Sequence, residues 1–591
     1  MLRLPLHTLA SVGLILFSSL AAQAEGPLDL IPKDASVVVR VKSPQATIAK
    51  VAGFVNAVQP GMGFVVQSQA AALGVGISNP TMGGVDLRND WYIAVFTVKN
   101  AEPAVVFLVP ATKGTEDRSG VDQMKEAVGD QFTFASKDNW VAYSMDEAVI
   151  ELVEDCIDDA GESVALDRRS NEVFDNSDIS VFVNIGATVG TYEDELKAGE
   201  EQIDIALEGI GAELQNADQG FNLAPIMEIY GQMARGALQG VRDSDALTVG
   251  VTVDSDALVI EELLLVEADS GSDKFLQSHP TDELAVLNRL PQDKLGYFAM
   301  HGDFTALAKW GMEFAVKVMG DNDDTADVKE KLEKISATMN EIEFGSAAWA
   351  FGLGDGDKGI LEGYAISQAT PAAKVQELSR LMGQGYNINV PGVKQEFSVE
   401  KGAEKYGDLS ADIIRIKQEF DETADPLGVQ KKLQSVLYGD NGIEQRVVVK
   451  DENHVVQTFG GGKAAMEELI EAAGSADASS DSAVGKARSG LMEKANVVGL
   501  IDLPNLALKI GRAALANEDI AANAPVKLKH LEGITVPASF IGFAAGTEAQ
   551  GVRFRTEIPS KTFQNFAQIA AYVQQMKIKE AQEERNSDDD F

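Results

Sequence analysis

The alternation of apolar and polar positions predicts short strands that each run into a helix. The first unit opens with a turn at Ile31–Asp34, continues as the apolar run Val37–Val41, and takes helical spacing from about Gln45 to Val55. Proline and aspartate favour turns, and β-branched residues favour strands. The stretch therefore predicts a turn, a buried strand and a helix.

This unit recurs later in the chain. Pro291 matches Pro32 and Asp293 matches Asp34, at an offset of 291 − 32 = 259. An internal repeat at a fixed offset outweighs single motifs as a guide to architecture, because it describes the whole building plan. The chain is therefore interpreted first as a repeat.

Two looser copies of the strand-into-helix step are present. They lie at Asp178–Ile185 and Asn496–Leu503, and each apolar run ends near a short polar residue, Asn184 or Asp502. Such residues accept hydrogen bonds from the first turn of a helix. We therefore expect each of them to cap the helix that follows.

Pairs of apolar strands around polar turns lie between these units, a pattern that predicts β-hairpins. The four pairs span 91–98 with 104–109, 247–253 with 258–265, 347–353 with 360–366, and 539–545 with 551–558. Two further strand–turn–strand patterns carry Lys137–Asp138 and Lys450–Asp451 and lead into helices. The order strand–helix, hairpin–helix, Lys-Asp hairpin–helix, strand–helix, hairpin–helix thus occurs twice along the chain.

The repeated order predicts an α+β fold with internal duplication. We expect two homologous halves, residues 25–284 and 285–578, each with a largely antiparallel sheet flanked by helices. A Ser/Ala/Asp-rich stretch near 474–486 predicts a flexible linker in the second half. Residues 579–591 end in Asp588–Asp590 and Phe591 and predict an acidic, disordered tail.

Residues 1–24 have the pattern of a secretion signal. An apolar stretch is followed by Ala22–Gln23–Ala24, the small-residue pattern before a cleavage site. The remaining chain has no apolar run that approaches the ~20 residues of a membrane-spanning helix. We therefore expect an exported protein, periplasmic or extracellular, with no transmembrane segment after signal removal.

Charge narrows the choice of partners. The chain has 50 Lys plus Arg against 91 Asp plus Glu, and loss of the signal leaves 49 − 91 = −42. Such a surface repels phosphate backbones, so we expect no nucleic-acid partner. Cys156 is the only cysteine, on an apolar helical stretch, and an intrachain disulfide is therefore impossible.

The motifs that could carry chemistry are incomplete. The five histidines form no close pair, and Gly161–Ala165 follows a helix rather than the strand that a nucleophile elbow needs. Gly460–Lys463 lacks the Ser or Thr of a phosphate loop. Asp321–Asp327 lacks the glycine and glutamate of a calcium loop, and Gly354–Asp357 suits a hairpin turn. We assign no catalytic, cofactor-binding or metal-ligating residue.

Two long helical stretches, Glu193–Gln239 and Phe304–Met339, occupy the same place in the two halves. Their apolar faces predict core packing, although a groove for an apolar ligand could form between such helices and the sheet.

The stretches Ile31–Val55 and Leu290–Trp310, together with the repeated order of units after a secretion signal, resemble a group of uncharacterised exported bacterial proteins. Those proteins are long and acidic and are known mainly as domains of unknown function. The shared Pro-x-Asp motif identifies no catalytic residue. The resemblance therefore implies an exported repeat protein and no particular reaction.

We expect a soluble, non-enzymatic binding or structural protein of the bacterial cell envelope, whose partner is an envelope protein or a hydrophobic ligand. One alternative is a carrier that holds a lipid-like ligand in a groove between helices and sheet. Another is a hydrolase with an unrecognised site. Co-purified lipid would favour the carrier, and an activity lost on changing one carboxylate would favour the hydrolase.

Overall fold

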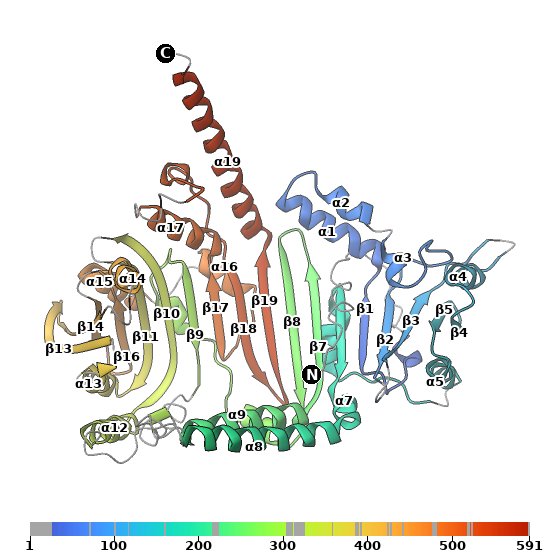
Figure 1. Ribbon diagram of the computed structural model, residues 1–591, viewed down its shortest axis with the longest axis horizontal. Coiled ribbons are helices and arrows are strands. Elements are labelled where there is room, and N and C mark those ends of the chain that lie inside the picture. The colour runs from blue at the N-terminus through green and yellow to red at the C-terminus, as the bar shows by residue number, and fades with distance from the viewer. Residues whose placement is uncertain are drawn as a thin grey trace. The chain divides into compact units, whose positions relative to one another are not determined.

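A computed structural model gives the architecture of the chain (Figure 1). It describes residues 27–588 except for 70–71, 98, 100–101, 116–117, 159–160, 216–223, 303–310, 313–325, 357–358, 384–388, 391–392, 422–424, 426–427, 440–441, 476–481, 517–520 and 522–523. The expected signal, residues 1–24, lies outside this part.

The fold is α+β and its described strand pairs are antiparallel, which confirms the predicted fold class and sheet type. The chain divides into two compact units. Unit 1 comprises Met1–Glu200, Gly236–Gln277 and Glu548–Ala570, and unit 2 comprises Glu201–Arg235, Ser278–Thr547 and Ala571–Phe591.

The strands of unit 1 form a sheet with β1 near its middle (Figure 1). In spatial order they are β4 (Thr133–Lys137), β5 (Trp140–Ser144), β3 (Ala104–Pro110), β2 (Trp91–Phe96), β1 (Val37–Val41), β6 (Ile179–Asn184), β7 (Ser244–Val253), β8 (Ala257–Val266) and β19 (Gly551–Pro559). The expected boundary placed residues 548–570 in the second half. They belong to unit 1 because β19 pairs along its whole length with β8.

Helices cover both faces of the unit 1 sheet. They are η1 (Pro27–Leu30), α1 (Pro44–Val58), α2 (Gly63–Ser68), α3 (Ala72–Gly76), α4 (Gly120–Val128), α5 (Glu147–Ile157), α6 (Arg168–Asn176), α7 (Ile185–Thr191) and α10 (Gly271–Gln277). Val38 and the apolar side of α5 share one core, whereas α1 and α4 pack into a second core. Alternate residues of each strand therefore enter different cores.

The strands of unit 2 run, in spatial order, β13 (Val393–Tyr406), β14 (Leu409–Phe420), β15 (Ile443–Val449), β16 (His454–Phe459), β11 (Gly359–Thr370), β10 (Glu343–Gly356), β9 (Gly296–Met300), β17 (Val497–Ile501) and β18 (Ile541–Glu548). The short β12 (Asn389–Val390) pairs with β13. The β9 strand thus has β10 on one side and β17 on the other.

The helices of unit 2 also lie on both sides of its sheet. They are η3 (Ala285–Arg289), α12 (Ala326–Met339), α13 (Ala372–Gly383), α14 (Val429–Tyr438), α15 (Gly462–Gly474), α16 (Ala483–Ser489), α17 (Leu503–Leu515) and η5 (Leu528–His530). The η3, α15 and α16 helices share a core with Tyr297 and Ala299, and α12 and α13 build a second core. The helices α8 (Glu193–Gln215), α9 (Ala224–Asp243) and α19 (Ser560–Asp588) contain residues of both units.

The two predicted helix caps are confirmed. The Asn184 side chain accepts a hydrogen bond from the backbone N–H of Ala187 at 3.0 Å, and α7 begins at the next residue. The Asp502 side chain accepts one from the N–H of Asn505 at 3.3 Å, at the start of α17. Each cap satisfies a donor that the first helical turn leaves unpaired.

The prediction of a disordered tail over 579–591 is wrong for residues 579–588. They continue α19, which ends at Asp588. Glu580 holds this helix in unit 2 by ion pairs with Lys527, Lys529 and His530. These partners lie about fifty residues earlier in the chain, so the local sequence gives no sign of them. Of the expected linker near 474–486, residues 476–481 lie outside the described part and Ala483 begins α16.

Candidate functional site

One face of the unit 2 sheet carries a block of aromatic side chains. Tyr297 and Ala299 of β9 face the core under α15, so the alternating residues face the other side. Five of the aromatic residues on that other side are neighbours across the strands, and we call them the aromatic face: Phe298, Trp349, Phe351, Phe459 and Phe543.

Strand pairing brings these residues together. Phe298 lies opposite Trp349 of β10, and their ring centroids are 5.7 Å apart at a tilt of 41°. On its other side Phe298 faces Gly499 of β17, which in turn faces Phe543 of β18. A single row across four strands therefore reads Trp349, Phe298, Gly499, Phe543.

The phenylalanines of the aromatic face lie opposite glycines. Phe543 faces Gly499, and a Cβ at Gly499 would collide with the Phe543 ring. Phe351 stands in the same relation to Gly296. Glycine weakens a strand interior, and an aromatic ring that packs across the neighbouring strand compensates for it. These rings therefore lie over the backbone of the neighbouring strand instead of standing upright from the sheet.

The third such pair is Phe459 with Gly363, where a Cβ would lie 3.3 Å from the ring. Phe543 is 43 % exposed, and the other four aromatic residues are partly exposed. An exposed cluster of this kind is more informative than single exposed apolar residues, which are common on protein surfaces.

The aromatic face is uncharged. Charged residues make up 24 % of the chain. None occurs on this side of the sheet in three consecutive rows from β15 to β18: Val447, Gln457, Ala365, Trp349, Phe298, Gly499 and Phe543; Gln445, Phe459, Gly363, Phe351, Gly296, Ile501 and Ile541; Val449, Val455, Ser367, Ala347, Met300, Val497 and Ala545. At the β15 and β16 end of these rows, Val447 and Val455 are buried in the core that contains α12 and α13. The polar members of the rows include Gln445, which donates to Gln457 at 3.1 Å.

The opposite face, under α15, carries a polar network. The Lys294 ammonium donates to the Tyr364 hydroxyl at 3.0 Å and to the Glu468 carboxylate at 2.9 Å. The same hydroxyl lies 3.0 Å from a carboxylate oxygen of Glu362 and 2.9 Å from one of Glu468, so its single proton can serve only one of them at a time. Burial, together with these carboxylates, raises the pKa of Tyr364.

Arg446 anchors a second part of this network. Its guanidinium donates to Glu404 at 2.9 and 3.1 Å and pairs with Glu444 at 2.5 Å, and its side chain is 5 % exposed. Burial lowers the pKa of Arg446, but the two carboxylates raise it more. Nη1 of Arg446 and Oγ1 of Thr458, its cross-strand neighbour, have no hydrogen-bond partner within the described part of the chain.

This network is interpreted as structural. The Gly460–Gly462 stretch, where a phosphate loop was considered, has positive φ at all three glycines and forms the turn from β16 into α15. Lys463 lies over the Tyr406 ring, 5.6 Å from its centroid, rather than over an open cradle. The carboxylates already balance the nearby cations, so the arrangement holds the sheet and the helix together.

The histidines do not form a catalytic triad in the described chain. Nδ1 of His301 lies 3.0 Å from Oγ of Ser346, which donates to Asp282 at 3.1 Å. In a triad the carboxylate bonds the histidine, whereas here it bonds the serine. Ser346 is also 2 % exposed, which keeps substrate away from it.

The remaining candidates carry no site in the part of the chain that the structure describes. No three His, Cys, Asp or Glu side chains there gather as metal ligands would, and none of its helices is long and apolar enough to cross a membrane. The acidic loop Asp321–Asp327 lies outside the described residues except for its last two. Cys156 is buried, and burial and nearby Asp155 raise its pKa, which disfavours the reactive thiolate.

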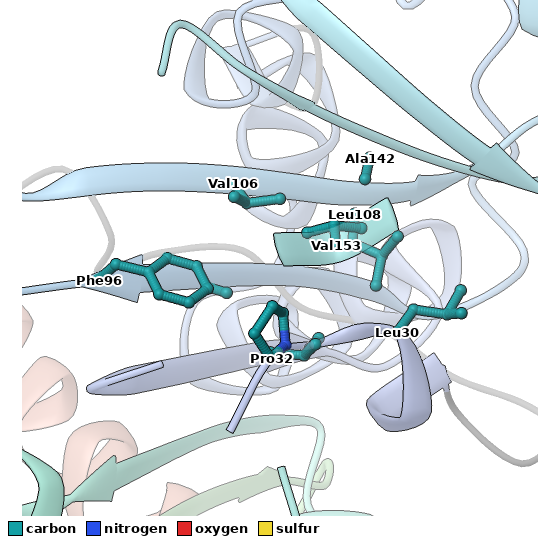
Figure 2. A pocket seen from close by; sticks show the side chains of 9 residues that line it. Leu30, Pro32, Phe96, Val106, Leu108, Ala142 and Val153 are labelled. Carbon is teal, nitrogen blue, oxygen red and sulfur yellow. The ribbon is translucent and has the colours of Figure 1, made fainter. Parts of the chain in front are cut away.

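The interior of unit 1 contains a narrow apolar space between the sheet, η1 and α5. Figure 2 shows its lining side chains directed toward one another, and the lining consists of Leu30, Ile31, Pro32, Ala94, Phe96, Val106, Leu108, Ala142 and Val153. All nine are buried. The space is therefore part of the core rather than an open groove.

Reasoning from the sequence missed the aromatic face. A partial signal is present, since Trp349 and Phe351 alternate along one strand and Gly542 precedes Phe543. The glycine opposite each phenylalanine becomes visible only when strand partners are known. Searches of family models, curated proteins and solved structures find no match to this chain.

Proposed function

We propose that the protein is an exported, non-enzymatic binding protein of the bacterial cell envelope, and that it binds its ligand on the aromatic face. One observation carries the proposal: five partly exposed aromatic side chains form a continuous, uncharged surface on a strongly acidic chain. Contiguous apolar surface costs solubility and marks binding sites.

We further propose that the two units are homologous halves, because their strand pairing corresponds position by position. Val39 lies between Ile93 and Val181, and Phe298 lies between Trp349 and Gly499. The order β5–β3–β2–β1–β6–β7 in unit 1 matches β16–β11–β10–β9–β17–β18 in unit 2.

Backbone hydrogen bonds outside the strands support the same correspondence. Lys42 donates to the carbonyl of Asp178, and His301 donates to that of Asn496, which keeps the offset of 301 − 42 = 259. Asn184 donates to Ser36, and Asp502 donates to Leu295, at offsets of 502 − 184 = 318 and 295 − 36 = 259. Two unrelated sheets would not be expected to share such details of register.

The correspondence makes the aromatic face significant. Where unit 1 pairs Val181 with Val249, unit 2 pairs Gly499 with Phe543. Where unit 1 pairs Val37 with Val95, unit 2 pairs Gly296 with Phe351. In unit 1, valine pairs occupy these positions of the sheet. Valine favours strands more than glycine does. The glycine–phenylalanine pairs are therefore best explained by a function of the surface.

Oxidative footprinting tests the proposed surface. Hydroxyl radicals would label the protein in isolated envelopes and again after purification, and labelled residues would be found by mass spectrometry. We expect Trp349 and Phe543 to be protected in the envelope. Phe554 of β19, which is 41 % exposed against 43 % for Phe543, is the matched control and should be labelled equally in both samples. Equal labelling of all three would contradict the proposal.

Export is tested separately by the mature N-terminus. Mass spectrometry should find Glu25 as the first residue, because the small-residue pattern ends at Ala24. An intact Met1 or Leu2 terminus in the envelope fraction would refute this part of the proposal.

A lipid-like ligand remains the second candidate, because the rows of the aromatic face continue into aliphatic residues such as Ile501 and Ile541. Organic extraction of the purified protein followed by mass spectrometry would detect a bound lipid. A stoichiometric lipid that is lost in a Phe351→Ala variant would favour the carrier.

A further inference from the structure

We propose that the aromatic face binds a neutral glycan chain by stacking sugar rings on its aromatic rings. This inference rests on the proposed function and names the ligand class of the same surface. It is carried by the position of the rings over the neighbouring strands, the length of the row, the polar groups beside it and the absence of charge from its rows.

The glycines leave room for the rings. Because a Cβ at Gly499 or Gly296 would collide with the ring of Phe543 or Phe351, each ring occupies the space above its glycine. The Cδ1, Cε1 and Cζ atoms of Phe543 and of Phe351 thus lie beside the backbone of the neighbouring strand. The flat side of any aromatic ring carries negative π-electron density. It attracts the positively polarised C–H groups of a pyranose ring.

The row is extended in one direction. Trp349 and Phe543 lie three strands apart, on β10 and β18, with Phe298 between them. Neighbouring strands are about 4.8 Å apart, so the row spans roughly 14 Å. A linear chain of rings can follow such a row, whereas an acyl chain is usually bound in a concave, enclosing pocket.

Amide groups lie beside the row. Gln457 shares a register row with Trp349, and Gln445 lies opposite Phe459. Amide side chains can both donate and accept hydrogen bonds, which matches the hydroxyl groups around a sugar ring. An aliphatic ligand would gain nothing from these two residues.

Charge selects a neutral glycan. The rows of the aromatic face contain no lysine or arginine that could bind a sulfate, phosphate or uronate group. The net charge of −41 for the full chain repels polyanions as they approach. The face is thus suited to unsubstituted or N-acetylated sugar units and unsuited to acidic polysaccharides.

Titration calorimetry with three probes tests the inference. The probes are neutral β-1,4-linked hexose oligosaccharides with and without N-acetyl groups, a heparin-type polyanion, and phosphatidylcholine vesicles. We expect the full chain to bind at least one neutral oligosaccharide and not the polyanion. Trp349→Ala and Phe543→Ala should each weaken binding by about 2- to 10-fold, the range of one aromatic contact. Phe554→Ala should leave binding unchanged.

Trp349→Phe separates a binding defect from a folding defect. It keeps a ring at the position and should retain most of the affinity that Trp349→Ala loses, with both variants checked by thermal unfolding. Binding of the vesicles but of neither oligosaccharide, through the same residues, would overturn the glycan assignment and leave the proposed function intact. If the oligosaccharides bind equally to wild type and to all the alanine variants, the glycan assignment is also wrong. Protection of Trp349 in the envelope is measured by footprinting, independently of the titrations. A failure of the proposed function can therefore be told apart from a failure of the glycan assignment.

Discussion

Replacement of Gly499 by alanine should tilt one ring of the aromatic face while changing stability little. The new Cβ would collide with Cε1 and Cζ of Phe543 and lie 2.8 Å from its Cδ1. These atoms belong to a side chain that is 43 % exposed, so the ring can rotate toward solvent rather than displace backbone. The ring would then leave its present position beside Gly499.

The cost can be worked out from burial. Full burial of a phenylalanine side chain stabilises a fold by about 1.5–3 kcal/mol, and Phe543 keeps somewhat more than half of that. Complete displacement of the ring would therefore cost about 1–1.7 kcal/mol. Alanine in place of a strand glycine returns about 0.5–1 kcal/mol. The expected net loss is about 0–1 kcal/mol.

Urea unfolding gives the change in stability, and the binding titration gives the change in affinity. Gly352→Ala is the matched control in unit 2, because its Cβ would make only an ordinary contact, 3.4 Å from Cδ of Lys294, on another strand of the same sheet. We expect weaker ligand binding only in Gly499→Ala. A loss of stability above about 3 kcal/mol would show that the ring cannot rotate away, and the reasoning from its exposure would be refuted.

Further predictions concern the charged network, the C-terminal helix and the two central strands. Arg446→Met should lower the free energy of unfolding by about 1–3 kcal/mol, because the partly buried Glu404 loses its guanidinium partner while Glu444 keeps Arg415, whereas the same change at the exposed Arg88 should alter it little; urea titration would measure both. Hydrogen bonds from Lys527, Lys529 and His530 lower the pKa of Glu580 to about 2 from 4.5, so the attachment of α19 is complete above about pH 4.5 and is lost as the pH falls toward 2; limited proteolysis should show this release, and Glu580→Gln should release the helix at neutral pH. Val38→Asp, at a site with no exposed surface, should destabilise the fold by several kcal/mol, at least about 2 kcal/mol more than Phe298→Asp at a partly exposed one, and equal losses in thermal unfolding would contradict the assignment of faces.

The elements that could be predicted from the sequence are those with a local cause. Val37–Val41 and Gly296–Met300 are strands where alternation and the Pro-x-Asp turn placed them, and Asn184 and Asp502 cap helices because a cap needs only its own next turn. The apolar pattern alone does not tell the two sides of a central strand apart, as Val39 of β1 and Phe298 of β9 show. Val39 is buried, whereas Phe298 is partly exposed.

The features that were missed depend on distant partners. Glu580 lies in a run that looks like a solvated acidic tail, and only its contacts with Lys527 and His530 make that run part of an ordered helix. The aromatic face depends on which glycine lies opposite which phenylalanine. The sequence of a single strand does not show which residue of the neighbouring strand lies opposite. Residues whose role depends on a distant partner can be recognised only from the three-dimensional structure.

The pairing of β19 with β8 has a consequence for how the chain matures. The open edge of β8 is closed by Gly551–Pro559, which is synthesised about three hundred residues later. Until that segment emerges, unit 1 carries an unpaired, largely apolar edge strand that could pair with other chains. The N-terminal unit therefore cannot finish folding on the ribosome ahead of the rest, and a chain truncated before residue 551 would be prone to aggregate through that edge.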